Sequence, residues 1–291
     1  FNQVEAYRKQ QESGEIVFEN STEAPKKPLY PSTPNFPEEE IVTYELAPLY
    51  YKSGNDNILS PDNIKELNKV ANLLIEYPQL KVTLSSNSDG SDPLEFDLFF
   101  SIKRAEKAAE YLVDNDVNPN NIHLKGLGAN YPIAKNETES GPNRIGKRLN
   151  RRIDLEVFNT AGLPIKIEAK APNISSFLVN EQGNEYSGAI TGLSYKVQIA
   201  SLKQRYKGSL IHNYIDPMIE KKQNSQLYQY TIGLFQSYQA AENLRKELEG
   251  QGINDAFVVP YINGVRASRD DSKIYSAAYP DLLNFLREAG Q

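Results

Sequence analysis

Between residues 41 and 159 the chain alternates between segments with strand spacing and segments with helix spacing, which restricts the folds it can adopt. Four segments have strand character: residues 41–46, 80–84, 122–125 and 153–158. Two helices are expected, because Ser60 and Asp92 are capping residues that each stand directly before a proline. The pattern predicts an α+β domain in which both helices pack on one sheet.

The second of these helices should carry two different stripes of side chains. Apolar residues at helical spacing form its buried stripe: Leu94, Leu98, Ile102, Ala105, Ala109 and Leu112. Another stripe, about 100° away, consists of Asp97, Ser101, Arg104 and Ala108. This stripe lies at the edge of the buried face, where we expect the wall of a cleft.

Charged residues from three places in the sequence can meet at this cleft. Asp89 lies in the loop before the helix, Arg104 lies on the helix, and Arg151 comes much later in the chain. A carboxylate accepts hydrogen bonds from an ammonium group, and a guanidinium grips a carboxylate with two parallel hydrogen bonds. The three residues therefore suit a ligand that carries both groups, namely an amino acid or an amino-acid side chain.

Two other structures use some of the same residue types. A solvated helix face with an internal salt bridge would show the same spacing. A calcium loop would need the EF-hand register, which puts its glycine position at Asp92 and its closing glutamate position at Leu98. The sequence therefore excludes an EF-hand loop and leaves the salt bridge open.

Composition restricts the function further. The 291 residues allow two domains, and the net charge of −6 argues against general affinity for nucleic acid. Cysteine is absent and histidine occurs twice, with His123 at the position of a strand side chain, so we expect no metal site, no cofactor and no Ser-His-Asp triad. No apolar run approaches the roughly 20 residues of a membrane-spanning helix. Because the chain begins with Phe1, we expect that a preceding segment has been removed or is missing.

The sequence divides into four parts: residues 1–40, 41–159, 160–193 and 194–291. Proline recurs at every third position from Pro25 to Pro37, which is typical of polyproline II, so the first part is predicted to be an extended linker. A docking strip for a partner's aromatic groove is the alternative. The third part is a connector in which residues 165–169 alternate like an edge strand.

The last part has the pattern of a second domain. Strands are predicted at residues 195–202, 227–235 and 256–261, and helices at residues 237–249 and 281–289. Asn263-Gly264 predicts a hairpin turn before Val265. We also expect a helix within residues 203–224, interrupted by Gly208 and Pro217.

Several short motifs occur together in the first domain: Ser88-Asp89, Ser101-Ile102-Lys103-Arg104-Ala105, Gly126-Leu127-Gly128, Pro132-Ile133-Ala134, Asn136 and Asn150-Arg151-Arg152. With these motifs the domain resembles the OmpA-like C-terminal domain, the peptidoglycan-binding module of Gram-negative cell envelopes. The resemblance implies a βαβαββ fold that binds the diaminopimelate of a peptidoglycan stem peptide. By motif position Asp89 and Arg104 would hold the amino-acid group of diaminopimelate, and Asp97, Asn150 and Arg151 would assist.

Three positions depart from the usual pattern of that family. Ser86-Asn87-Ser88-Asp89 stands where the family usually has Gly-His-Thr-Asp, Asp92 replaces a glycine, and Asp97 replaces an asparagine. A carboxylate at position 97 would either strengthen the contact with an ammonium group or pair with Arg104 and compete with the ligand.

The second domain contains two similar strand motifs, Tyr195-Lys196-Val197-Gln198-Ile199-Ala200 and Tyr230-Thr231-Ile232-Gly233-Leu234-Phe235. It resembles a SPOR domain, which implies an RNP-like βαβ repeat that binds glycan strands lacking stem peptides. Five side chains on one predicted sheet face are candidate glycan contacts: Gln198, Tyr228, Tyr230, Tyr261 and Arg266. Alternatively, the tyrosines are half-buried sheet residues, or the domain docks onto another protein.

These expectations describe a non-enzymatic protein of the periplasm that anchors an envelope or outer-membrane complex to the cell wall. Composite proteins of similar type occur in gliding and type IX secretion machines of Bacteroidetes-like bacteria, so an assembly scaffold with weak or no wall binding is one alternative. A peptidoglycan hydrolase is another. An amidase of that kind needs a zinc site, for which two distant histidines are poorly suited. A glycosidase needs two facing carboxylates, and Asp89 with Asp97 could be misread as such a pair.

Overall fold

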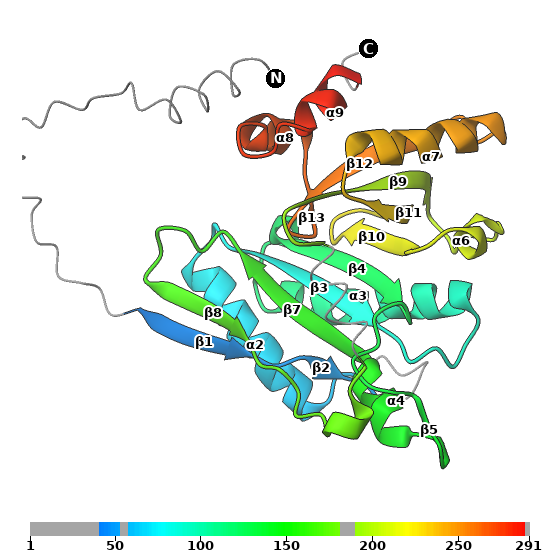
Figure 1. Ribbon diagram of the computed structural model, residues 1–291. Coiled ribbons are helices and arrows are strands. Elements are labelled where there is room, and N and C mark those ends of the chain that lie inside the picture. Colours follow the sequence, from blue (N-terminus) through cyan, green and yellow to red (C-terminus); the bar gives the residue numbers. More distant parts are fainter. Residues whose placement is uncertain (1–40, 53–57, 181–189, 289–291) are drawn as a thin grey trace, which may run out of the picture. The chain divides into compact units, whose positions relative to one another are not determined.

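The computed structural model describes residues 41–52, 58–180 and 190–288 (Figure 1). The proline-rich linker predicted for residues 1–40 lies outside the described residues. Among the helices of the described residues, none is both long enough and apolar enough to cross a membrane.

The part of the chain up to residue 180 contains strands and helices in alternation. Its strands are β1 (Val42–Leu46), β2 (Leu49–Tyr50), β3 (Lys81–Asn87), β4 (Ile122–Gly128), β5 (Glu137–Thr138), β6 (Gly141–Pro142), β7 (Arg152–Phe158) and β8 (Ile165–Ala169). Its helices are α2 (Pro61–Glu76), η1 (Pro119–Asn121), α3 (Leu94–Asp114), α4 (Arg144–Asn150) and η2 (Ser176–Leu178). The strands and both long helices predicted for the first domain are therefore present.

The two long helices begin in different ways. At α2 the prediction is confirmed, because Ser60 Oγ accepts a hydrogen bond from the backbone N–H of Asn63 at 3.2 Å. At α3 the prediction that Asp92 caps the helix is wrong. Pro93 occupies the capping position in an extended conformation, and its carbonyl accepts a hydrogen bond from the Asp97 N–H at 3.0 Å. The helix therefore begins one residue later than predicted.

The remaining part of the chain also alternates. It consists of β9 (Leu193–Leu202), α6 (Leu210–Asn213), β10 (Met218–Lys222), β11 (Tyr228–Phe235), α7 (Tyr238–Gly250), β12 (Phe257–Ile262), β13 (Val265–Arg266), α8 (Arg269–Tyr275) and α9 (Leu282–Glu288). The hairpin turn is confirmed, since Asn263 and Gly264 both have positive φ, at 48° and 75°. The helix predicted within residues 203–224 is present but short: α6 lies between Gly208 and Pro217, ends where Tyr214 becomes extended, and strand β10 follows.

One nine-stranded sheet runs through both parts of the chain, in the order β13-β12-β9-β11-β10-β4-β3-β7-β2. The parts join where β10 pairs in antiparallel fashion with β4, with Glu220 opposite Lys125 (Figure 1). Helix α3 packs on β3 and β4, and α7 packs on β9 and β12, so apolar side chains from both parts share one core. The segment predicted as an edge strand forms β8, which pairs in parallel with β1 in a separate two-stranded sheet.

A buried polar cluster reinforces the joint between the two parts. The Glu106 carboxylate on α3 accepts hydrogen bonds from Lys221 on β10 and from the Tyr228 hydroxyl on β11, the latter at 2.9 Å. Lys103 forms an ion pair with the same carboxylate. The ring of Tyr228 packs edge-on against Phe99, with ring centroids 5.6 Å apart. Tyr228 is therefore a contact within the fold and is buried.

We expect Tyr228→Ala to lower the free energy of unfolding by about 3 kcal/mol, because it removes a buried ring from the joint. Tyr228→Phe keeps the ring and should cost about 2 kcal/mol, because the hydroxyl's hydrogen bonds to the charged groups of Glu106 and Lys103 are lost. Urea denaturation measures both changes. Tyr275→Ala on α8, where the side chain is 44% exposed, is the matched control and should change stability by less than about 0.5 kcal/mol. Equal stability of Tyr228→Ala and the control would contradict the structure of the joint.

Candidate functional site

The site begins at the end of β3, where the chain turns toward α3. The Ser88 N–H donates a hydrogen bond to the Gly128 carbonyl at 2.7 Å, and the Gly128 N–H donates to Ser101 Oγ on α3 at 3.2 Å. Gly90 has a φ of +70°, a conformation that glycine adopts without strain. These bonds hold the loop that carries Asp89 against the first turns of α3.

Asp89 is buried and lies in an ion pair. Its Oδ2 is 2.5 Å from Arg151 Nη1 and accepts a hydrogen bond from Ser91 Oγ at 3.1 Å. Its Oδ1 is buried and accepts no hydrogen bond from any of the described residues. One oxygen of this carboxylate is therefore satisfied, while the other has capacity for a donor.

Arg104 is only 2% exposed, which is unusual for an arginine. Its Nη1 donates a hydrogen bond to the Asn87 carbonyl at 3.1 Å, and its guanidinium carbon is 5.7 Å from the ring centroid of Tyr51. Burial lowers the pKa of Arg104, while Tyr51 and Asp89 oppose that shift. The prediction that this stripe forms the wall of a cleft is therefore wrong. All four of its residues are buried inside the fold: Asp97, Ser101, Arg104 and Ala108.

Asp97 completes the group of buried charges on α3. Burial raises its pKa to about 6, with smaller contributions from the negative charges of Asp92 and Asp89. The neighbouring Ser88 hydroxyl and the positive charge of Arg104 lower this pKa. The carboxyl group of Asp97 thus changes its charge close to neutral pH, whereas an ordinary aspartate does so near pH 4.

Asn150 and Arg151 reach the site from the end of α4. Arg151 also donates hydrogen bonds to the carbonyls of Tyr51 and Lys52, at 3.2 and 2.6 Å. Asn150 acts through Asn136, because its Nδ2 donates to Asn136 Oδ1 at 2.8 Å and Asn136 Nδ2 donates to the Asp89 carbonyl at 2.7 Å. The structure thus brings the five predicted residues together, and it adds Tyr51 and Asn136 to the site.

The five candidate glycan contacts of the second domain do not all lie on one face of the sheet. Gln198 on β9 stands opposite Thr231, whereas Tyr230 on β11 stands opposite Ala200. Because successive strand residues face opposite sides, Tyr228 and Tyr230 share one face and Gln198 lies on the other. The prediction of one shared face is therefore wrong.

Arg266 shares the face of Gln198. Its Nη2 donates a hydrogen bond to Gln198 Oε1 at 2.8 Å, and its Nη1 donates to Gln229 Oε1 at 2.9 Å. Tyr261, on the same face, donates a hydrogen bond to Glu220 and is buried. Tyr230 is buried as well, with its hydroxyl accepting a hydrogen bond from the Tyr206 N–H at 3.0 Å.

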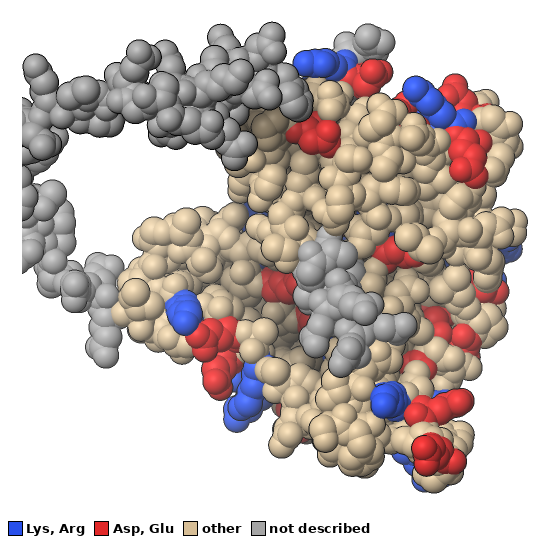
Figure 2. Space-filling model, in the orientation of Figure 1, with Lys and Arg blue, Asp and Glu red and all other residues tan. Residues whose placement is uncertain are grey.

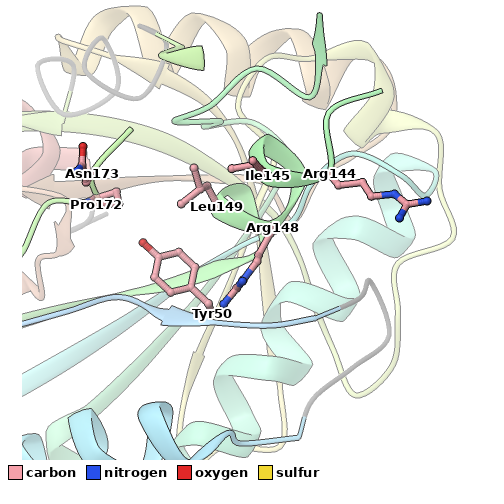
Figure 3. Close-up of a pocket in the computed structure, with 7 residues that line it drawn as sticks. All are labelled: Tyr50, Arg144, Ile145, Arg148, Leu149, Pro172 and Asn173. Carbon is pink, nitrogen blue, oxygen red and sulfur yellow. The ribbon is translucent and has the colours of Figure 1, made fainter. Parts of the chain in front are cut away.

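A pocket of about 510 Å³ lies beside α4, and the sequence did not indicate it. It is lined by Tyr50, Arg144, Ile145, Arg148, Leu149, Pro172 and Asn173 (Figure 3). Figure 3 shows the Arg148 side chain running alongside Tyr50, while Arg144 points away from the other lining residues. A second pocket, of about 330 Å³, lies where residues 94 and 130–131 meet residues 211–217.

The surface charge of the described residues, on one face of the molecule, is unlike that of a nucleic-acid site. On the face shown in Figure 2, basic and acidic side chains of the described residues lie in small mixed groups. Together with the net charge of −6, this distribution differs from the basic stripe that nucleic-acid binding needs.

Two protein-family models match the chain. Residues 50–146 match the OmpA family and residues 194–260 match the SPOR domain. Outer membrane porin F of Pseudomonas fluorescens is 26% identical over 121 residues, which are 42% of this chain and 35% of that protein. The peptidoglycan-binding protein ArfA of Mycobacterium bovis is 34% identical over 105 residues, which are 36% of this chain and 31% of that protein.

Among solved structures, the peptidoglycan-associated lipoprotein from Burkholderia pseudomallei is 23% identical to this chain. The match has a TM-score of 0.33 and covers 38% of this chain and 89% of that chain. The chain spans about a third of the length of porin F and of ArfA, 35% and 31%. The two family matches follow one another along the sequence without overlap. The chain therefore carries an OmpA-family domain followed by a SPOR domain.

Proposed function

We propose that this protein is a non-enzymatic anchor that binds peptidoglycan and attaches an envelope or outer-membrane complex to the cell wall. The observation that carries the proposal is the buried group of Asp89, Asp97, Arg104 and Arg151, in which one oxygen of Asp89 accepts no hydrogen bond from the described residues. Buried charges of both signs are costly to a fold unless they serve a ligand or pair closely. A zwitterionic group such as the amino-acid end of diaminopimelate matches both signs.

Binding would rearrange the ion pair between Asp89 and Arg151. The ligand's ammonium group donates to Asp89 and Asp97, and its carboxylate accepts from Arg104 and Arg151. Because the Asp89 side chain is 2% exposed and that of Arg151 12%, the site has to open before a ligand enters. Arg151 then exchanges one carboxylate partner for another, so its charge stays compensated throughout.

The relatives support a location in the cell envelope. One is an outer membrane porin and another is named a peptidoglycan-binding protein, which fits attachment to the wall from the periplasm. Within the second domain, Arg266 remains our candidate for glycan contact, since its side chain is 25% exposed, and the buried Gln198 holds it in place through a hydrogen bond. Tyr228 and Tyr230 are packed inside the fold and are unsuited to stacking on sugar rings.

The function is tested by incubating the protein with purified sacculi. An anchor sediments with the sacculi and releases no muropeptides. Release of muropeptides would identify a hydrolase. Failure to sediment, together with capture of a secretion or motility protein, would identify an assembly scaffold.

We expect Asp89→Asn to lower the affinity for sacculi at least tenfold, because a neutral amide cannot pair with an ammonium group as a carboxylate does. The substitution conserves size, so circular dichroism should show a folded protein. Asp92→Asn removes the same charge from a neighbouring residue outside the buried group and is the matched control. Equal affinity of Asp89→Asn and the control would remove Asp89 from the binding site.

We expect Asp97→Asn to stabilise the protein and weaken its binding. The pKa of about 6 in the folded state lies above the ordinary value of 3.8, so the ionised carboxylate destabilises the fold above about pH 6. At about pH 7.5 the substitution should therefore raise the free energy of unfolding by roughly 1–3 kcal/mol, and this gain should shrink as the pH falls toward about 4.

The binding of the unsubstituted protein should weaken below about pH 6, as Asp97 becomes protonated and loses its attraction for an ammonium group. The binding of Asp97→Asn should not weaken over this pH range. Urea denaturation and sacculus sedimentation across the same pH range measure both effects. Stronger binding of Asp97→Asn at neutral pH would show instead that Asp97 competes with the ligand for Arg104.

A further inference from the structure

Helix α4 presents a second, separate set of basic residues. Arg151 and Arg152, which follow one another at its end, pair with Asp89 at 2.5 Å and with Asp154 at 3.0 Å. Arg144 and Arg148 form no ion pair with any residue that the structure describes. They are four residues apart on the helix, so they lie on one side of it. This side of α4 has positive charge without a compensating partner in the described chain.

The pocket of about 510 Å³ lies on this side of α4, and its walls are mixed in character. Leu149 and Pro172 supply apolar surface, and Arg148 lies along Tyr50 (Figure 3). Ile145 on the rim is 64% exposed. Such a pocket suits an anion that carries an aliphatic portion, because the guanidinium binds the charge and the apolar wall covers the rest.

Tyr50 adds a hydrogen-bond donor to the pocket. Burial raises its pKa, and the negative charge of Asp154 adds to the shift, while Arg152 and Arg148 oppose it. The phenol is therefore protonated at neutral pH and can donate to an anionic oxygen beside Arg148.

The pocket is adjacent to the buried charged site. Arg148 lies in the last turn of α4, and Arg151 directly follows that helix, with its N–H donating a hydrogen bond to the Lys147 carbonyl at 3.1 Å. Tyr50 and Tyr51 are consecutive residues, and Tyr51 lies against Arg104. A ligand a few residues long that occupies the buried site can therefore reach the pocket as well.

Resting on the proposed function, we infer that this pocket is a second subsite, which binds a stem-peptide carboxylate outside the diaminopimelate group. Arg148 binds that carboxylate, Tyr50 donates a hydrogen bond to it, and Leu149 with Pro172 covers the neighbouring aliphatic chain. Diaminopimelate fills the buried site, and the preceding glutamate of the stem peptide provides the second carboxylate. The subsite would make a complete stem peptide a better ligand than diaminopimelate alone.

The test compares three probes by isothermal titration: free diaminopimelate, a synthetic stem tetrapeptide, and the same tetrapeptide with its glutamate carboxylate amidated. Arg148→Gln should weaken binding of the tetrapeptide about tenfold and leave free diaminopimelate within about twofold, because a charged hydrogen bond to one carboxylate is lost. The amidated peptide should bind the unsubstituted protein about tenfold more weakly than the tetrapeptide, and Arg148→Gln should not weaken it further.

Arg287→Gln is the control, since it removes the same charge from an exposed side chain on α9 that does not line the pocket. It should change tetrapeptide binding by less than about twofold. Equal losses in both variants would reveal a general effect of the net charge of the protein and overturn the subsite. So would equal loss of diaminopimelate and tetrapeptide, or tighter binding of inorganic phosphate than of the tetrapeptide. If none of the three probes binds the unsubstituted protein, the proposed function fails along with the subsite.

Discussion

The burial of the Arg104 guanidinium is the constraint on which the site depends. A buried cation needs acceptors and counter-charges, and the Asn87 carbonyl, Asp89 and Asp97 provide them from β3, from the following loop and from α3 itself. Arg151, which directly follows α4, connects that helix to the site by pairing with Asp89. Every element of the site is thus held by its contact with a buried charge, which explains why residues far apart in the sequence converge.

In this arrangement, the Asp97 carboxylate that would aid binding lowers the stability of the fold. Asp97 is ionised at neutral pH at a cost to the fold, since burial raises its pKa to about 6. A fold selected for stability alone would carry a neutral side chain there. Retaining a carboxylate is understandable where a cationic ligand offsets the cost of burial on binding.

Local patterns in the sequence predicted much of the fold. The cap at Ser60, the apolar stripe of α3 and the Asn263-Gly264 turn depend on neighbouring residues alone, and the structure bears them out. Apart from the cap at Asp92, the misses depend on distant contacts. Residues 218–222 pair with β4 of the other domain, which no local pattern reveals, and the register shift between Tyr230 and Thr231 places Gln198 on the face opposite the two tyrosines. The meeting of Asp89 with Arg151 was predicted from family resemblance, since spacing alone left a simple salt bridge open.

The shared sheet changes how two wall-binding domains would act together. Domains joined by a flexible linker gain affinity through a high effective concentration, which the length of the linker sets. Here β10 pairs with β4, and Glu106 bonds across the joint to Lys221 and Tyr228, so the two domains meet as one body. Their sites then have a fixed separation and direction. Under the proposed function, a wall segment would occupy both sites only where its peptide and its glycan match that geometry, so the joint would select for the arrangement of the wall as well as for its chemistry.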